Sequence, residues 1–300
     1  MSGLRERWSA VLGAPSCEKK GGAVTKESGF SHEDFDAEWY RQECSGGRTQ
    51  RVLVLIPKGL TVKAPAVVVP FYFPEAMLGY DPATGEELPR YRGIEMMHHL
   101  VKRGYVVASA DAYHLSYIES DKDRSDFSRW GDAAAALHRD HPQYCGMGKL
   151  TDDTRLLVDL LSADARVDAA RIGIAGHSLG GKMAFYAGCL DERIGAILAS
   201  DFGIGWHQTN WDAEWYFGKD AARLAAEGYE HAELLKIDKK PFCLIAGLYD
   251  TDESRELACR FGGYGEADER FLFINHATGH RPPEWALTEG YDFLDKWLKN

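Results

Sequence analysis

Short apolar runs alternate with amphipathic segments along most of the chain. Apolar runs rich in β-branched residues predict buried strands at residues 66–69, 105–110, 171–175, 194–199, 241–246 and 270–274. Apolar residues at helical spacing predict helices at residues 94–103, 151–162, 183–190, 253–261 and 284–299. Strands and helices that alternate in this way are typical of parallel β-α-β units. We therefore predict an α/β fold, a three-layer α/β/α sandwich around a mostly parallel sheet of about eight strands.

A hairpin precedes this alternation. Residues 38–44 and 51–57 have strand character and flank the turn sequence Ser45-Gly46-Gly47, which predicts an antiparallel pair. Residues 1–35 are polar and weakly patterned. We interpret them as an N-terminal extension, a helix and a loop, that packs on one domain of residues 36–300.

Two long segments interrupt the alternation, near residues 111–150 and 201–240. Each follows a predicted strand, so each is expected at the carboxyl edge of the sheet, where open α/β folds bind ligands. Segments of this length in a compact domain usually serve as lids or binding insertions. Directly after the first, Thr151 is expected to cap the helix at 151–162.

Charge and cysteine content narrow the function classes. The 300 residues include 46 acidic and 35 basic side chains, a formal net charge of -11. Such a surface repels phosphate backbones and anionic lipid, so we expect no nucleic-acid or membrane partner. The six cysteines form no Cys-x-x-Cys pair, and Cys189 and Cys243 are expected as buried thiols. With no signal-like or membrane-spanning apolar run, the expected location is the cytoplasm.

One motif carries a specific chemistry. Gly176-His177-Ser178-Leu179-Gly180-Gly181 fits the pattern G-x-S-x-G between a predicted strand and a predicted helix. That context is typical of a nucleophilic serine on a strained turn, whose neighbours two residues away must be small. We predict Ser178 as the nucleophile. The alternative is a glycine-rich turn without chemistry.

The serine needs a base and an acid, and with this strand–turn–helix motif both are expected after the serine in the sequence, the acid first and then the histidine. His280 and His276 both follow the last predicted strand, and we prefer His280 because Gly279 lets the backbone bend before it. The acid is expected after the strand at 241–246, where we prefer Asp250. Asp252 is more simply a first-turn carboxylate of the next helix.

His231 lies among charged residues and is expected to be solvated. The amide of Leu179 is one expected oxyanion donor. The second should come from the loop Pro70-Phe71-Tyr72-Phe73-Pro74, with Phe73 preferred and Tyr72 second.

These residues resemble the α/β-hydrolase superfamily, and within it the dienelactone-hydrolase-like and acetyl xylan esterase-like branch. The resemblance rests on residues 146–155, 166–173 and 176–181 and on Gly279-His280. It implies ester hydrolysis through an acyl-enzyme, with no metal or organic cofactor. Dienelactone hydrolases carry cysteine where this chain has Ser178, which favours a carboxylesterase. Glucuronoyl esterases carry arginine where this chain has Leu179, although Lys182 matches their sugar-contacting lysine. Lys182 can also be read as a solvated helix residue.

The segment 201–217 holds three tryptophans among polar residues, a composition suited to sugar rings or to a lid held by aromatic packing. We assign five residues to substrate binding: Tyr72, His177, Lys182, Trp206 and Trp211. The predicted function is hydrolysis of small-molecule carboxylic esters, short-acyl or carbohydrate esters among them. The alternatives are a peptidase or lactonase with the same triad, and a catalytically silent binding protein. The oligomeric state stays open, a homo-oligomer included.

Overall fold

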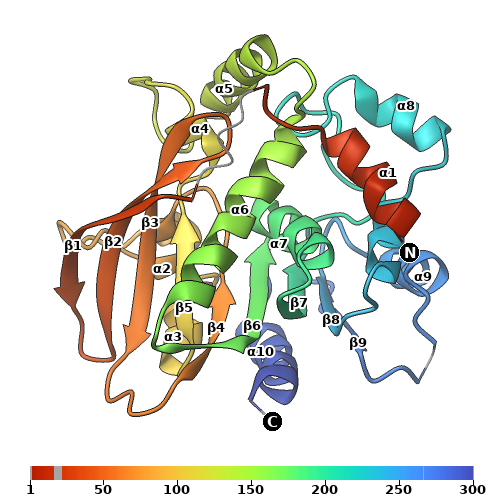
Figure 1. Ribbon diagram of the computed structural model, residues 1–300. Coiled ribbons are helices and arrows are strands. Elements are labelled where there is room, and N and C mark those ends of the chain that lie inside the picture. The colour runs from red at the N-terminus through yellow and green to blue at the C-terminus, as the bar shows by residue number, and fades with distance from the viewer. Residues whose placement is uncertain (1, 17–21, 266, 300) are drawn as a thin grey trace.

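A mixed, mostly parallel β-sheet runs through the computed structural model, which describes residues 2–16, 22–265 and 267–299 (Figure 1). In these ranges the sheet has nine strands in the order β1-β2-β3-β5-β4-β6-β7-β8-β9. The strands are β1 (Val24–Ser31), β2 (Phe35–Cys44), β3 (Arg48–Pro57), β4 (Ala64–Val68), β5 (Val106–Ala110), β6 (Val167–His177), β7 (Ile194–Ser200), β8 (Phe242–Ala246) and β9 (Phe271–Asn275). The predicted fold class is confirmed.

Helices cover both faces of this sheet. They are α1 (Ser2–Leu12), α2 (Pro74–Leu78), α3 (Met96–Lys102), α4 (Tyr113–Ser116), α5 (Phe127–Asp140), α6 (Gly146–Ala163), α7 (Leu179–Leu190), α8 (Asp220–Ala226), α9 (Asp252–Gly262) and α10 (Glu284–Leu298), with 3-10 turns at Pro89–Tyr91 and His231–Lys236. In the described part of the chain, none of them is long and apolar enough to cross a membrane.

Alternate residues of the strands feed two separate hydrophobic cores. Val52 and Val54 of β3 pack into the core beneath α6 and α7, which lie in front of the sheet in Figure 1. Leu53 and Leu55 of the same strand pack into the opposite core with α2, α3 and α10. Because side chains of a strand alternate between faces, a continuous apolar run is what a strand buried on both sides requires.

The predicted hairpin is confirmed as β2 and β3, which pair from Phe35↔Pro57 to Cys44↔Arg48. Gly46 and Gly47 both take positive φ in its turn, a backbone conformation that glycine adopts without steric cost. Residues 24–31 were expected in a loop, but they form β1, which pairs antiparallel with β2 at the edge of the sheet. Residues 17–21 of the predicted N-terminal extension lie outside the described residues.

The helix predicted at 151–162 begins earlier than expected. It starts at Gly146, and the Sγ atom of Cys145 accepts the amide of Gly148 at 3.3 Å as the N-terminal cap. Thr151 instead lies inside the helix, where its hydroxyl donates to the carbonyl of Met147 at 2.7 Å. Because the helix begins five residues earlier, Thr151 is an interior residue whose hydroxyl group bonds to a backbone carbonyl of the same helix, and it does not act as a cap.

The two long segments lie where the sheet order predicts. The segment after β5 forms α4, α5 and the first turn of α6, and the segment after β7 forms α8 and the 3-10 turn at His231–Lys236. Strands β5 and β7 belong to the parallel set that includes β6. Both segments therefore emerge at the same edge of the sheet as the turn that carries Ser178.

Helix α1 is anchored by one large side chain. Trp8 is fully buried, and its ring centroid lies 5.8 Å from that of Tyr186, 5.4 Å from that of Tyr229 and 5.8 Å from that of His231. Tyr186 lies on α7, and the other two rings lie in or beside the 201–240 segment. The N-terminal helix is thus joined to both the helix that follows Ser178 and the segment beside it.

We expect Trp8→Ala to destabilise the whole fold, because it empties the space of a fully buried indole. Loss of a buried tryptophan costs about 3–5 kcal/mol in the free energy of unfolding. Urea unfolding followed by circular dichroism measures this value. The exposed neighbour Ser9→Ala is the control and should change stability by less than about 0.5 kcal/mol. Equal stability of the two variants would show that α1 is not docked as described.

Candidate active site

Ser178 occupies a strained turn between β6 and α7. Its backbone has φ 57° and ψ -118°, a conformation that residues other than glycine seldom adopt. A Cβ atom on Gly176 would lie 2.1 Å from the carbonyl oxygen of Gly180, and one on Gly180 would lie 2.1 Å from that of Pro70. Both glycines are therefore required by steric contact, as the motif predicts. The turn also packs the loop after β4 against the start of α7.

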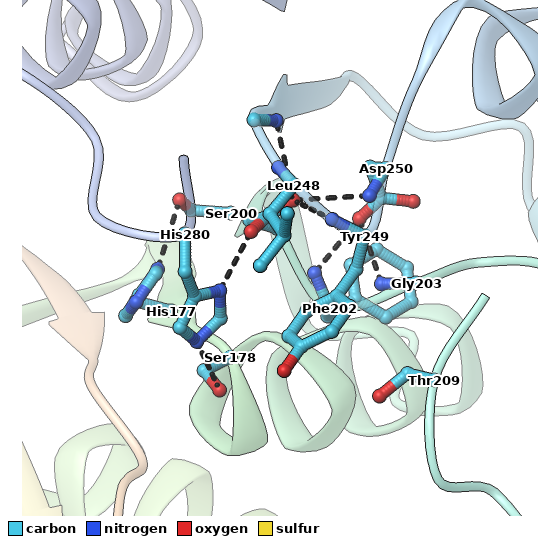
Figure 2. Close-up of polar contacts among 12 residues, drawn as sticks. His177, Ser178, Ser200, Phe202, Gly203, Thr209, Leu248, Tyr249, Asp250 and His280 are labelled. Atoms are coloured by element: carbon cyan, nitrogen blue, oxygen red, sulfur yellow. Dashed lines mark hydrogen bonds and ion pairs between the residues drawn. The ribbon is translucent and has the colours of Figure 1, made fainter. Parts of the chain in front are cut away.

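His280 lies against Ser178, as the sequence predicts. Its Nε2 atom is 2.9 Å from the Ser178 hydroxyl oxygen, and its side chain is 34% exposed (Figure 2). Gly279, just before it, has φ 112°. The other candidate, His276, has Nδ1 2.8 Å from the hydroxyl oxygen of Thr278 and has no hydrogen bond to Ser178 among the described residues. The structure thus brings together the predicted nucleophile and base.

The carboxylate that the structure places against His280 is not that of the predicted acid, Asp250. The Nδ1 atom of His280 lies 2.6 Å from Oδ2 of Asp201, which comes directly after β7. The carboxylate of Asp250 is fully buried and accepts amides of the loop after β7 instead, from Phe202 at 2.7 Å and from Gly203 at 2.8 Å (Figure 2). It also accepts the amide of Ile204 at 2.8 Å. With its oxygens committed to these amides, Asp250 cannot orient the imidazole.

The two carboxylates hold each other's loops. While Asp250 binds the amides after Asp201, Oδ1 of Asp201 accepts the amides after β8: Gly247 at 3.2 Å, Leu248 at 2.9 Å, Tyr249 at 2.8 Å and Asp250 at 3.0 Å. We call this reciprocal arrangement the Asp201–Asp250 clasp. It fixes Asp201 at φ 43°, with Oδ2 left to face His280. The strained backbone at Asp201 is thus held by hydrogen bonds from the neighbouring loop.

The two acids differ in their electrostatics. Burial alone would raise the pKa of Asp201, but the hydrogen bonds from His280 and from the amides of Asp250 and Leu248 outweigh it and lower the pKa. At Asp250 burial prevails over the amide hydrogen bonds, so the pKa of that carboxyl is raised. Asp201 is therefore the carboxylate suited to stay ionised beside an imidazole.

His177, assigned to substrate binding, lies behind the imidazole of His280. It is 3% exposed, its Nδ1 atom is 3.1 Å from the Ser200 hydroxyl oxygen, and its ring centroid is 4.6 Å from that of His280. Burial, followed by the nearby His280, lowers the pKa of His177 to about 3. A neutral ring here supports His280 without adding charge, and leaves little surface for a substrate.

Lys182 is buried, so the interpretation as a solvated helix residue is wrong. It lies one turn after Ser178, and its ammonium group donates to the carbonyl of Phe202 at 2.9 Å and the hydroxyl of Thr209 at 3.2 Å. The Nζ atom also lies 4.5 Å from the ring centroid of Trp211 and 5.1 Å from that of Tyr216. Burial lowers the pKa of Lys182 to about 7, although Asp250 and Asp201 oppose that shift.

The aromatic segment forms a packed wall. Trp211 is fully buried and its indole nitrogen donates to the carbonyl of Gly203 at 2.7 Å, so its assignment to substrate contact is wrong. Trp206 is half-buried and donates to the carbonyl of Tyr229 at 2.7 Å. His231 was expected in solvent, but it is buried with its ring 3.9 Å from Trp206 and 4.0 Å from Trp211. Aromatic packing outweighs the charged sequence neighbours of His231.

The remaining predicted residues lie beside the turn. Leu179 is the first residue of α7, so no preceding helical turn accepts its amide. Phe73 is buried at the start of α2, and Tyr72 is half-buried with its carbonyl accepting the amide of Ala112 at 3.1 Å. The roles of Leu179, Phe73 and Tyr72 stay predictions. In the described ranges, the residues around Ser178 form no group with the spacing of metal ligands.

Asp201 was missed although the sequence carries a signal for it. It lies two residues after the strand predicted at 194–199, and Gly203 and Gly205 after it allow a tight loop. The carboxyl ends of β7 and β8 lie side by side, since these strands are paired neighbours. An acid after either strand can therefore reach the same imidazole, and the sequence order of the three residues does not distinguish them.

Ser178 lies on a strained strand-to-helix turn of a mostly parallel sheet, within hydrogen-bond distance of His280, which also contacts Asp201. This combination of fold and side chains defines an α/β-hydrolase. Solved structures share this fold over nearly the whole chain. A Bacteroides fragilis protein described as a "putative acetyl xylan esterase" has TM-score 0.68 and 16% identity, covering 92% of this chain and 74% of its own. A glucuronoyl esterase from Solibacter usitatus has TM-score 0.67 and 13% identity, covering 98% and 91%.

Residues 51–208, just over half of the chain, match the dienelactone hydrolase family. The chain belongs to that family. It is also similar to the "Putative hydrolase YtaP" of Bacillus subtilis, with 26% identity over 164 residues. That match covers 50% of this chain and 54% of the relative, so this chain spans about half the length of the curated relative it matches.

The lowered pKa of Lys182 has a measurable consequence for stability. Between about pH 7 and the ordinary lysine pKa of 10.5, the unfolded chain binds a proton that the folded chain does not. Stability should therefore rise with pH in that range, by up to about 1.4 kcal/mol per pH unit. We expect Lys182→Met to lack this contribution when chemical unfolding of both proteins is compared at about pH 8 and pH 9. Lys219→Met, the loss of an exposed lysine, is the matched control; parallel curves for wild type and Lys182→Met would contradict the assignment.

Proposed function

We propose that this protein is a carboxylic ester hydrolase that acts through a Ser178–His280–Asp201 triad. The observation that carries the proposal is the continuous chain of contacts from the Ser178 hydroxyl through both ring nitrogens of His280 to Asp201, at 2.9 and 2.6 Å. Membership of the dienelactone hydrolase family supports the same class of reaction.

The reaction begins when the Ser178 hydroxyl oxygen attacks the ester carbonyl and His280 Nε2 takes its proton. Asp201 holds the Nδ1–H tautomer of the ring and stabilises the imidazolium that forms. The tetrahedral intermediate then loses the alcohol, which leaves with the proton from Nε2. An acyl-enzyme at Ser178 remains, and a water activated by His280 releases the acid and restores the serine.

The negative charge of the intermediate forms at the start of α7. The amide of Leu179 and the positive end of the helix face that position, which is where backbone donors lower the barrier. The second donor is proposed from the loop that follows β4, which packs against Gly180 through the carbonyl of Pro70. Phe73 and Tyr72 are the two candidate amides in that loop.

The proposed substrates are esters of small acyl groups on polar, carbohydrate-like alcohols. Ser178 is half-buried and the His280 side chain is 34% exposed, so the reacting atoms lie at an open surface that admits a bulky alcohol. Tyr249 borders this surface, with its ring centroid 4.8 Å from that of His280. Relatives of the same fold are named as acetyl xylan and glucuronoyl esterases, which is consistent with a sugar ester here.

Hydrolysis of p-nitrophenyl acetate against longer-chain p-nitrophenyl esters tests the proposal. We expect the wild type to prefer acetate and Ser178→Ala to lower kcat/KM by about three orders of magnitude or more, because the nucleophile is gone. Labelling of the wild type by a fluorophosphonate serine probe, and its loss in Ser178→Ala, checks the same assignment independently of substrate choice. Equal activity of the two proteins would overturn the proposed nucleophile, and a strong preference for long acyl chains would overturn the proposed substrate class.

Substitution of the two clasp aspartates distinguishes their roles. In Asp201→Asn, the amide oxygen can still accept the loop amides while its NH2 group faces His280 Nδ1 and forces the wrong tautomer. We expect kcat to fall by about 10⁴ with the melting temperature nearly unchanged. In Asp250→Asn, an NH2 group meets backbone N–H donors on one side, so the variant should lose stability.

The readouts are kcat, measured at a temperature where both variants are folded, and thermal unfolding. Folded Asp250→Asn should keep far more of the wild-type kcat than Asp201→Asn. The reverse ranking of kcat would show that Asp250 is the acid and that the contact of Asp201 with His280 is not used in catalysis.

A further inference from the structure

Three side chains at the amino edge of the sheet have the chemistry of metal ligands. His32 and Asp34 lie between β1 and β2, and His98 lies on α3. One ligand atom of each lies within 4.8 Å of the others. β3 runs antiparallel to both β5 and β2, and β2 is antiparallel to β1, so the β1–β2 connection lies at the edge opposite Ser178 (Figure 1).

One ring nitrogen of His98 has no hydrogen-bond partner within the described ranges. This nitrogen is Nε2, and it is buried. The ring lies edge-on to three aromatic neighbours, with centroids 5.5 Å from His32, 5.9 Å from Phe35 and 6.5 Å from Tyr80. A buried nitrogen without a partner is costly, and a bound cation would satisfy its lone pair.

The other two ligands are already oriented toward each other. Asp34 Oδ2 lies 3.8 Å from His32 Nδ1, and the Asp34 amide donates to the same nitrogen at 3.2 Å. Ligation through Nδ1 would replace that long hydrogen bond. Lys102 Nζ lies 3.6 Å from Asp34 Oδ2, but the lysine side chain is 54% exposed and free to turn into solvent. A cation would then take its place beside the carboxylate.

We propose that His32, Asp34 and His98 bind one divalent transition-metal ion, with Zn²⁺ as the representative ion and water in the remaining position. Two imidazoles and one carboxylate are a donor set that suits Zn²⁺ and its neighbours rather than Ca²⁺ or Mg²⁺. Tetrahedral ligation at about 2.0–2.1 Å requires the ligand atoms to lie about 3.3–3.4 Å apart, so binding draws the three groups together. The ion would fasten the connection of β1 and β2 to α3.

Calorimetric titration of chelator-treated wild-type protein with Zn²⁺ tests this site. We expect one ion per chain, and for His98→Gln a loss of affinity larger than the roughly 10–100-fold that loss of a second-shell partner costs. His99→Gln is the matched control, because His99 is the next residue on α3 and lies outside the group, with its Nδ1 atom 3.1 Å from the Tyr291 hydroxyl oxygen. Its affinity should equal that of the wild type.

Two further measurements cover a variant that fails to fold. Co²⁺ bound to the wild type should give visible absorption bands of four- or five-coordinate cobalt, which Zn²⁺ removes. Proton–nitrogen spectra of the wild type should show Zn²⁺ shifting the ring signals of two histidines, assigned with His32→Asn. Absence of Zn²⁺ binding by the wild type would overturn the site, as would binding that survives both His32→Asn and His98→Gln.

Discussion

The clasp between Asp201 and Asp250 is the interaction on which the arrangement of the site depends. Each carboxylate accepts backbone amides from the loop that carries the other, so the loops after β7 and β8 fold as one unit. Amides donated to a carboxylate make hydrogen bonds about twice as strong as those between neutral groups. The clasp leaves a single carboxylate oxygen, Oδ2 of Asp201, to meet His280. Four amides hold the Asp201 side chain in one rotamer, so it loses no conformational freedom when the imidazolium forms. The acid is therefore already in position before the reaction begins.

The turn at Ser178 shows how a strained backbone is tolerated. The positive φ of the serine is stabilised on both sides by close backbone contacts, with Gly176 against Gly180 and Gly180 against Pro70. The Ser178 amide also donates to the carbonyl of Ser200 at 2.7 Å, which ties the turn to the end of β7. Ser200, the residue before Asp201, thus holds the nucleophile through its carbonyl and contacts His177 through its hydroxyl group. Nucleophile, base and acid are positioned by one short stretch of adjacent strand ends.

The sequence predicted the features that depend on local pattern and failed where contacts between distant segments decide. Strand periodicity and the glycine spacing around Ser178 are local, and they identified the sheet, the turn and His280. Asp201 and Asp250 follow neighbouring strands, so only the cross-loop hydrogen bonds show which one faces the ring. Trp211, His231 and Lys182 were misjudged for the same reason. Their burial comes from the packing of residues 201–240 against α7, which charge and composition along the chain do not reveal.

Helix α1 is linked through side-chain contacts to residues close to Ser178. Trp8 lies 5.8 Å from His231, the same ring that lies 3.9 Å from Trp206 and 4.0 Å from Trp211, and Trp211 in turn lies under the ammonium group of Lys182. These five groups form an unbroken series of ring contacts from the first helix to the residue one turn beyond the nucleophile. Helix α1 therefore supports the aromatic wall beside Ser178, and a substitution in α1 can change the packing around Lys182 without changing any residue of the triad.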